Sequence, residues 1–158
     1  MDNEKIYLGI DPGKQGALAL LSSSGEVLDL LDMPYLEKEK TLDVLTLADF
    51  LKRLLEKGSL FCFLEKCQYT PHIKGSGAFT FGKTVGATET VLQVLGVPHQ
   101  LVRPQEWKKN YSLINADKTA SITLAKRLFP AVQDKLLKSK DGRAEALLIA
   151  EYCRRTVK

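Results

Sequence analysis

The stretch KIYLGIDPG, residues 5–13, decides the fold. Residues 5–11 are a mostly apolar run that favours a buried strand, and Pro12 and Gly13 close it as a turn. Asp11 therefore takes the last position of this predicted strand. A carboxylate at the end of a strand lies at the edge of a sheet, where a ligand can approach it.

Two more apolar runs follow at short intervals. Residues 16–21 (GALALL) and 26–31 (EVLDLL) predict short strands, and the Ser- and Gly-rich residues 22–25 predict a turn between them. Short strands joined by Gly-containing turns are typical of an antiparallel meander. The chain is therefore expected to open with three antiparallel strands.

The hydrophobic period changes after residue 40, where apolar residues recur at helical spacing. Residues 60–65 (LFCFLE) interrupt the helical pattern with an aromatic-rich strand that ends on an acid, Glu65. Asp117 is expected to cap the helix that follows it. We expect helices at residues 41–57, 78–95, 117–129 and 141–155, a short helix opened by Pro104, and strands at 60–65 and 99–103.

Four carboxylates stand in positions where the predicted elements could bring them together. Asp11 and Glu65 both end apolar strands, and Asp141 and Glu145 are four residues apart on one face of the last helix. Gathered acids raise each other's pKa values, and a bound cation relieves the repulsion. Hard oxygen ligands select Mg²⁺ or Mn²⁺. Two such ions activate water and stabilise the leaving oxygen in phosphodiester cleavage, so we expect two ions at the site.

Each acid also has a purely structural alternative. Asp11 can cap the Pro-Gly turn, and Asp141 can cap its own helix. Glu65 and Glu145 have basic neighbours in the sequence with which they can pair. Because all four residues would need separate structural roles, we favour one shared site.

Composition and charge bound the possible functions. The 158 residues, 44% of them hydrophobic and 27% charged, are typical of one soluble domain spanning residues 1–158. No apolar run reaches the length of a membrane span, and three cysteines with two histidines disfavour a zinc site. Residues 100–158 hold 13 Lys and Arg against 6 Asp and Glu. This basic part suits a polyanionic partner, although a solvated, lysine-rich helical surface is the alternative.

Three motifs in order carry a resemblance to a known family. LGIDPG (8–13), FLEKCQ (63–68) and DGRAEALLIAEY (141–152) resemble the RuvC-type Holliday junction resolvases, most closely their phage and plastid relatives. Residues 76–89 and 107–130 are similar to the same group. The first motif is shared by many RNase H-like and actin-like proteins, whereas the ordered set of three is specific.

The resemblance implies an α/β, RNase H-like fold: a five-stranded mixed sheet, its first three strands antiparallel, flanked by helices. It implies a homodimer that resolves four-way DNA junctions in recombination and repair by symmetric, Mg²⁺- or Mn²⁺-dependent nicking, leaving 5′-phosphate and 3′-hydroxyl ends. By position, Asp11, Glu65, Asp141 and Glu145 match the acids that are catalytic and hold the metal. Such a protein is expected in the cytoplasm of a bacterial or phage-infected cell, or in an organellar nucleoid, and not as a secreted protein.

The resemblance also indicates where DNA would bind. In the family, the loop after the second acid reaches the crossover of the junction, which makes Tyr69, His72 and Phe79 stacking candidates. A loop with one aromatic anchored in the core is the alternative, and we expect Trp107 to pin its short helix to the core. The expected DNA-binding residues are mostly basic: Lys66, Gln68, Tyr69, Lys74, Lys83, Lys108, Lys109 and Lys118.

One motif points elsewhere. Residues 77–84 fit the nucleotide-binding pattern GxxxxGK[ST], but no predicted strand directly precedes them, and we expect no nucleotide cofactor. We favour a helix start here, in which Gly82 and Gly86 allow close packing; in the family this helix contributes to the dimer interface. Two other functions remain open: an RNase H-like nuclease acting on RNA, and a non-catalytic junction-binding module. An actin-like ATPase is disfavoured because it needs two such domains.

Overall fold

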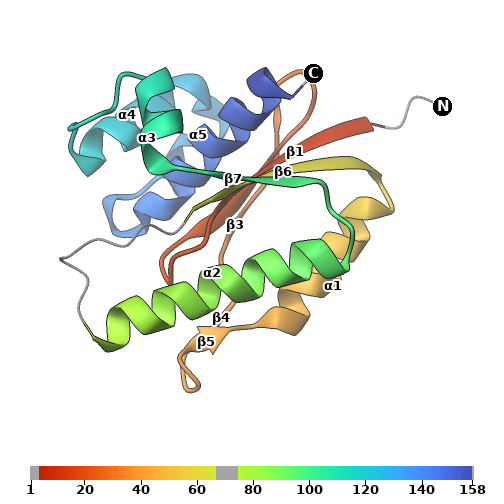
Figure 1. Ribbon diagram of the computed structural model, residues 1–158. Coiled ribbons are helices and arrows are strands. Elements are labelled where there is room, and N and C mark those ends of the chain that lie inside the picture. Colours follow the sequence, from red (N-terminus) through yellow and green to blue (C-terminus); the bar gives the residue numbers. More distant parts are fainter. Residues whose placement is uncertain (1–3, 67–74, 158) are drawn as a thin grey trace.

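The computed structural model describes residues 4–66 and 75–157. Its centre is a mixed five-stranded sheet in the order β3-β2-β1-β6-β7 (Figure 1). The first three strands pair antiparallel, as predicted, and β6 and β7 run parallel to β1, which makes the sheet mixed. The strands are β1 (Glu4–Asp11), β2 (Ala17–Leu21), β3 (Val27–Asp32), β6 (Gly58–Glu65) and β7 (His99–Val102).

Helices cover both faces of this sheet (Figure 1). Side chains alternate between the two faces along β1, so that Leu8 and Ile10 belong to one apolar cluster and Tyr7 to another on the opposite face. Both faces are therefore apolar and are covered by helices. None of the helices in the described ranges is long and apolar enough to cross a bilayer. The first face carries α1 (Val44–Leu55) and α2 (Ser76–Val94), and the second α3 (Pro104–Asn110), α4 (Lys118–Leu128) and α5 (Asp141–Thr156).

Several boundaries differ from the sequence prediction. The expected helix 41–57 begins only at Val44, because Asp43 caps it by accepting a hydrogen bond from the Thr46 amide at 3.1 Å. The residues before that cap belong to a two-stranded hairpin, which is too short to carry a hydrophobic period. The short elements missed from the sequence are β4 (Tyr35–Leu36), β5 (Thr41–Leu42), and the 3₁₀ helices η1 (Pro130–Lys135) and η2 (Lys138–Lys140).

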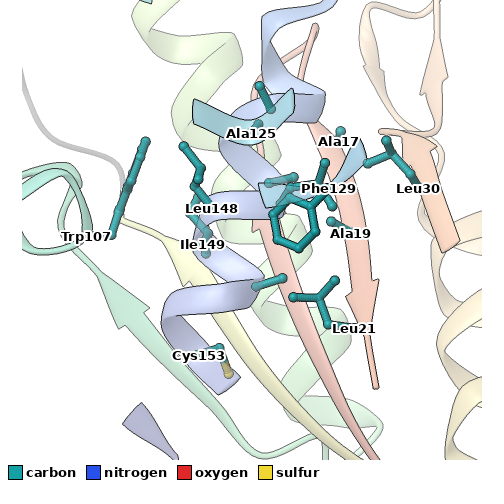
Figure 2. Close-up of a cluster of buried hydrophobic side chains, with 14 of the residues drawn as sticks. Ala17, Ala19, Leu21, Leu30, Trp107, Ala125, Phe129, Leu148, Ile149 and Cys153 are labelled. Atoms are coloured by element: carbon teal, nitrogen blue, oxygen red, sulfur yellow. The ribbon is translucent and has the colours of Figure 1, made fainter. Parts of the chain in front are cut away.

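Helix α5 lies unusually close to β1, and Gly9 makes this possible. A Cβ at Gly9 would overlap the carbonyl of Ala146 and lie 2.8 Å from the Cα of Ala150. Small residues on α5 complete the close approach. On this face, Ala17 and Ala19 of β2 lie in the cluster that holds Phe129 and α5 (Figure 2). The packing directs the first turn of α5 toward the end of β1.

Helix α2 confirms the helix start expected in the glycine-rich segment. The helix begins at Ser76, and Gly82 lies inside it. A Cβ at Gly82 or Gly86 would meet no atom within 4 Å, so neither glycine makes a close contact within the described chain. The pattern at residues 77–84 is helical, which is inconsistent with a phosphate-wrapping loop after a strand.

Candidate active site

The register of β1 and β6 brings the first two carboxylates together. Ile10 lies opposite Leu64 in the parallel ladder, so the next residue on each strand is an acid, Asp11 or Glu65. Both residues are partly buried at the same edge of the sheet. The amide of Gly13 donates to Oδ1 of Asp11 at 3.3 Å, so Asp11 also caps the turn that follows it.

The start of α5 closes over this edge. A Cβ at Gly142 would lie 3.1 Å from Oδ2 of Asp11 and would overlap the carbonyl of Gln15. Only a glycine therefore allows the first turn of α5 to lie against the turn between β1 and β2. Asp141 is the first residue of α5 and Lys140 takes the capping position, so the structural alternative for Asp141, a helix cap, is wrong.

The four carboxylates influence one another electrostatically. Burial raises the pKa of Asp11 to about 8, and the charges of Glu65, Glu145 and Asp141 contribute in the same direction. Burial, with the nearby charge of Glu145, raises the pKa of Glu65 to about 7, against the lowering effect of a hydrogen bond from Trp107. Burial also raises the pKa of Glu145. The structure thus brings the four acids close enough to affect the pKa of Asp11 together.

Trp107 orients one of these acids. Its indole Nε1 donates to Oε2 of Glu65 at 2.7 Å, and its side chain is completely buried. The prediction that Trp107 pins its short helix to the core is confirmed, and Figure 2 shows it at the margin of the buried cluster, to one side of α5. Its bond to Glu65 was missed, since no local pattern connects residues 42 positions apart.

Two predicted DNA-binding lysines pair with the other two acids. Nζ of Lys108 lies 3.7 Å from Oε1 of Glu145 and 5.1 Å from the ring centroid of Trp107. Nζ of Lys118 lies 2.7 Å from Oδ2 of Asp141, and this contact raises the pKa of Lys118. The structural alternative for Glu145, pairing with a lysine, is therefore also realised.

Among the described residues, the other predicted DNA-binding side chains lie outside the cluster of four carboxylates. Lys66, Lys83 and Lys109 are exposed, and Phe79 is 73% exposed near the start of α2. The other predicted positions lie outside the described residues: Gln68, Tyr69, His72 and Lys74.

An ion-pair cluster missed from the sequence ties the start of α5 to the sheet. Asp32, at the end of β3, accepts from Nε of Arg143 at 2.6 Å and also pairs with Lys140. Arg143 donates in addition to the carbonyl of Lys135. These contacts fix the chain on both sides of Asp141, and they assign Arg143 to Asp32 rather than to Glu145.

The donor set fits a hard divalent cation. All four side chains offer carboxylate oxygens, which Mg²⁺ and Mn²⁺ prefer, and the raised pKa values of Asp11 and Glu65 mark charge that a cation would stabilise. Within residues 4–66 and 75–157, no three Asp, Glu, His or Cys side chains are placed so that they could hold a metal ion together. Ammonium groups of Lys108 and Lys118 hold two of the carboxylates instead.

Comparisons with known proteins define the fold. The sheet order and the helices on both faces are those of the RNase H-like fold of RuvC-type resolvases, which confirms the predicted fold. No family model and no curated protein matches the chain.

Two of the solved structures with a similar fold are RuvC structures. The first, RuvC of Thermus thermophilus in complex with a Holliday junction substrate, has a TM-score of 0.61 and 18% identity over 97% of both chains. The second, a Thermus thermophilus RuvC structure, has a TM-score of 0.58 and 17% identity, covering 92% of this chain and 90% of that one. With sequence identities this low, the structural likeness establishes a shared fold.

Proposed function

We propose that this protein is a metal-dependent endonuclease that resolves four-way DNA junctions. One observation carries the proposal: on a RuvC-type fold, three separate segments bring Asp11, Glu65, Asp141 and Glu145 to one sheet edge, where they share an electrostatic environment. One of the solved structures with a similar fold is RuvC of Thermus thermophilus in complex with a Holliday junction substrate, which supports a branched DNA as the partner.

The four carboxylates are the proposed ligands of two Mg²⁺ or Mn²⁺ ions. Bound there, the ions would supply an activated water and would stabilise the leaving oxygen of the scissile phosphate. The chain's own part is to hold these ligands: Trp107 orients Glu65, and the Gly13 amide orients Asp11. Cleavage of the bond to the 3′ oxygen yields the proposed 5′-phosphate and 3′-hydroxyl ends.

Lys108 and Lys118 have a second proposed role. In the described structure each neutralises a carboxylate, and the Lys118 side chain is 81% exposed. When a cation neutralises the acids instead, both ammonium groups are free to contact DNA phosphates. Binding is therefore expected to weaken steeply with salt, because each phosphate contact releases counterions.

Symmetric nicking of two strands requires two sites, which supports a homodimer. Helix α2 offers a surface for a second copy, because a Cβ at Gly82 or Gly86 would meet no other segment of the described chain within 4 Å, and Phe79 is largely exposed. A second copy could approach the helix backbone closely at the two glycines.

Cleavage of a labelled synthetic four-way junction tests the proposed function. We would compare Mg²⁺ with chelator, and the junction with linear duplex, an RNA–DNA hybrid and structured RNA. Paired, symmetric nicks that require the metal and Asp11 are the expected result. Tight junction binding without nicks in any sequence context would indicate a binding module, and cleavage of RNA alone would indicate a ribonuclease of the same fold.

The substitution Trp107→Phe is expected to reduce nicking about 10- to 100-fold, because a ligating carboxylate loses the hydrogen bond that orients it. The reaction should also need more Mg²⁺ for half-maximal rate. Phe129→Leu is the control, since it trims a buried aromatic of the same cluster that has no bond to a candidate ligand. Equal Mg²⁺ requirements in the two variants would contradict the role of Trp107.

A further inference from the structure

A polar cleft of about 430 Å³ lies beside the candidate active site. It opens along the turn between β1 and β2, where Lys14 and Gln15 line it, and it reaches Lys140 before α5. Lys14 follows Asp11 by three residues, and Lys140 immediately precedes Asp141. The cleft also lies close to the gathered carboxylates in space, because a Cβ at Gly142 would overlap the carbonyl of Gln15, which lines the cleft, and would lie 3.1 Å from Oδ2 of Asp11.

A second cavity, of about 260 Å³, continues from the first. Lys14 and Tyr35 line both cavities, so these two side chains form the wall that they share. The second cavity extends to Thr80 and Phe81 in α2. Phe81 also approaches the β1–β2 turn, since a Cβ at Gly13 would lie 4.0 Å from its ring. Together the cavities follow this turn from the start of α5 to the start of α2.

The shared wall combines a cation and an aromatic ring, and an acid of the first cavity, Glu37, lies beside them. Nζ of Lys14 lies 5.3 Å from the ring centroid of Tyr35 and 2.9 Å from Oε2 of Glu37. The Lys14 and Glu37 side chains are 56% and 71% exposed. An ion pair this exposed contributes little stability, so another anion can replace the carboxylate at small cost. A phosphate presents the same kind of anionic oxygen to an ammonium group.

We propose that this cleft binds the DNA strand next to the scissile phosphate. Lys14 contacts a backbone phosphate, and the Tyr35 ring packs against the adjoining sugar or base. In the absence of DNA, the Glu37 carboxylate pairs with Lys14 in place of the phosphate. The inference rests on the proposed function for its choice of DNA as the ligand. It adds a specific strand-binding site and an acid that competes with DNA for that site.

The competition predicts opposite effects for the two partners of one ion pair. Lys14→Gln should weaken junction binding about 5- to 10-fold and reduce the slope of log affinity against log salt by about 1. Glu37→Gln should tighten binding several-fold, because Lys14 no longer has a competing carboxylate. The measurement is fluorescence anisotropy of a labelled junction across a salt series, with Ca²⁺ in place of Mg²⁺ to prevent cleavage.

A second surface pair provides matched controls. Lys52 and Asp49 on α1 lie 3.9 Å apart with exposures of 59% and 71%, close to those of Lys14 and Glu37. Lys52→Gln and Asp49→Asn make the same changes of net charge, and both should leave affinity and slope nearly unchanged. All four sites are exposed, and melting curves would verify that each variant is folded.

If the wild type nicks the junction, two results would overturn the cleft assignment while the proposed nuclease function stands. One is equal weakening by Lys14→Gln and Lys52→Gln, which would indicate an effect of overall charge. The other is unchanged or weaker binding by Glu37→Gln. If the wild type cuts no junction but binds DNA with these opposite effects, the cleft stands and the nuclease proposal fails. The cleft assignment also fails if the wild-type protein binds no DNA. It fails as well if Lys14→Gln weakens binding of an acidic peptide but leaves DNA binding unchanged.

Discussion

Asp11→Asn is expected to reduce nicking of a four-way junction by about 1,000-fold or more, because it removes a charged ligand from the centre of the site. Junction binding in Ca²⁺ should stay within a few-fold of wild type, since Asp11 is not a phosphate contact. The Asn side chain keeps the hydrogen bond from the Gly13 amide, so the local turn is preserved. Single-turnover cleavage and anisotropy would measure the two effects.

The same substitution is expected to stabilise the metal-free protein. Burial and the neighbouring carboxylates raise the pKa of Asp11 from 3.8 to about 8, so the folded state binds this proton more tightly than the unfolded state does. The free energy of unfolding therefore falls as the pH rises from about 4 to about 8. A neutral amide removes this loss of stability.

Melting curves in chelator at pH 5 and pH 8 would test this expectation. Asp11→Asn should melt above wild type by several degrees at pH 8, corresponding to about 1–2 kcal/mol, and by less at pH 5. Saturating Mg²⁺ should reduce or reverse the difference, because the cation stabilises only the wild-type cluster fully. A variant that melts below the chelated wild type at pH 8 would contradict the repulsion at the site.

Gly9→Ala is expected to destabilise the fold by roughly 3 kcal/mol or more, and to abolish nicking with it. The added Cβ would overlap the backbone of Ala146 and Ala150, which cannot rotate away as a side chain can. Helix α5 must shift from β1, and the shift would carry Asp141 and Glu145 away from the strand ends. Urea unfolding followed by far-UV circular dichroism would measure the loss.

Gly86→Ala is the matched control for this substitution. Its Cβ would meet no atom of the described chain, and alanine favours a helix interior over glycine by about 0.5–1 kcal/mol. A dilute sample should therefore unfold at slightly higher urea. If Gly9→Ala stays within about 1 kcal/mol of wild type, the close packing of α5 on β1 is not required. A loss of stability at high protein concentration by Gly86→Ala would indicate that a second copy packs on α2.

Much of the site was visible in the sequence because its signals are local. Asp11 and Glu65 each follow an apolar run that reads as a strand, and Asp141 and Glu145 share a helix face. The sequence did not show which basic side chains neutralise these acids. Lys108 and Lys118 were expected to meet phosphate, and the structure pairs them with two of the acids from a different part of the chain.

The hairpin β4–β5 shows a second limit. Strands of two residues have no hydrophobic period, so nothing in the sequence separated them from the helix that follows. The same hairpin positions Tyr35 beside Lys14, and with it the wall of the proposed strand-binding cleft. The cleft could not be predicted, because it depends on where a short, irregular segment folds against the β1–β2 turn.

The sequence by itself determined the order of the main strands and helices and the acids at their ends, because apolar periodicity, turn residues and caps act over a few positions. Only the tertiary structure decided which acids meet and what neutralises them. That outcome depends on the parallel register of β1 and β6 and on the close approach of α5 at Gly9 and Gly142. Both are contacts between distant segments, where backbone fit rather than local preference sets the geometry.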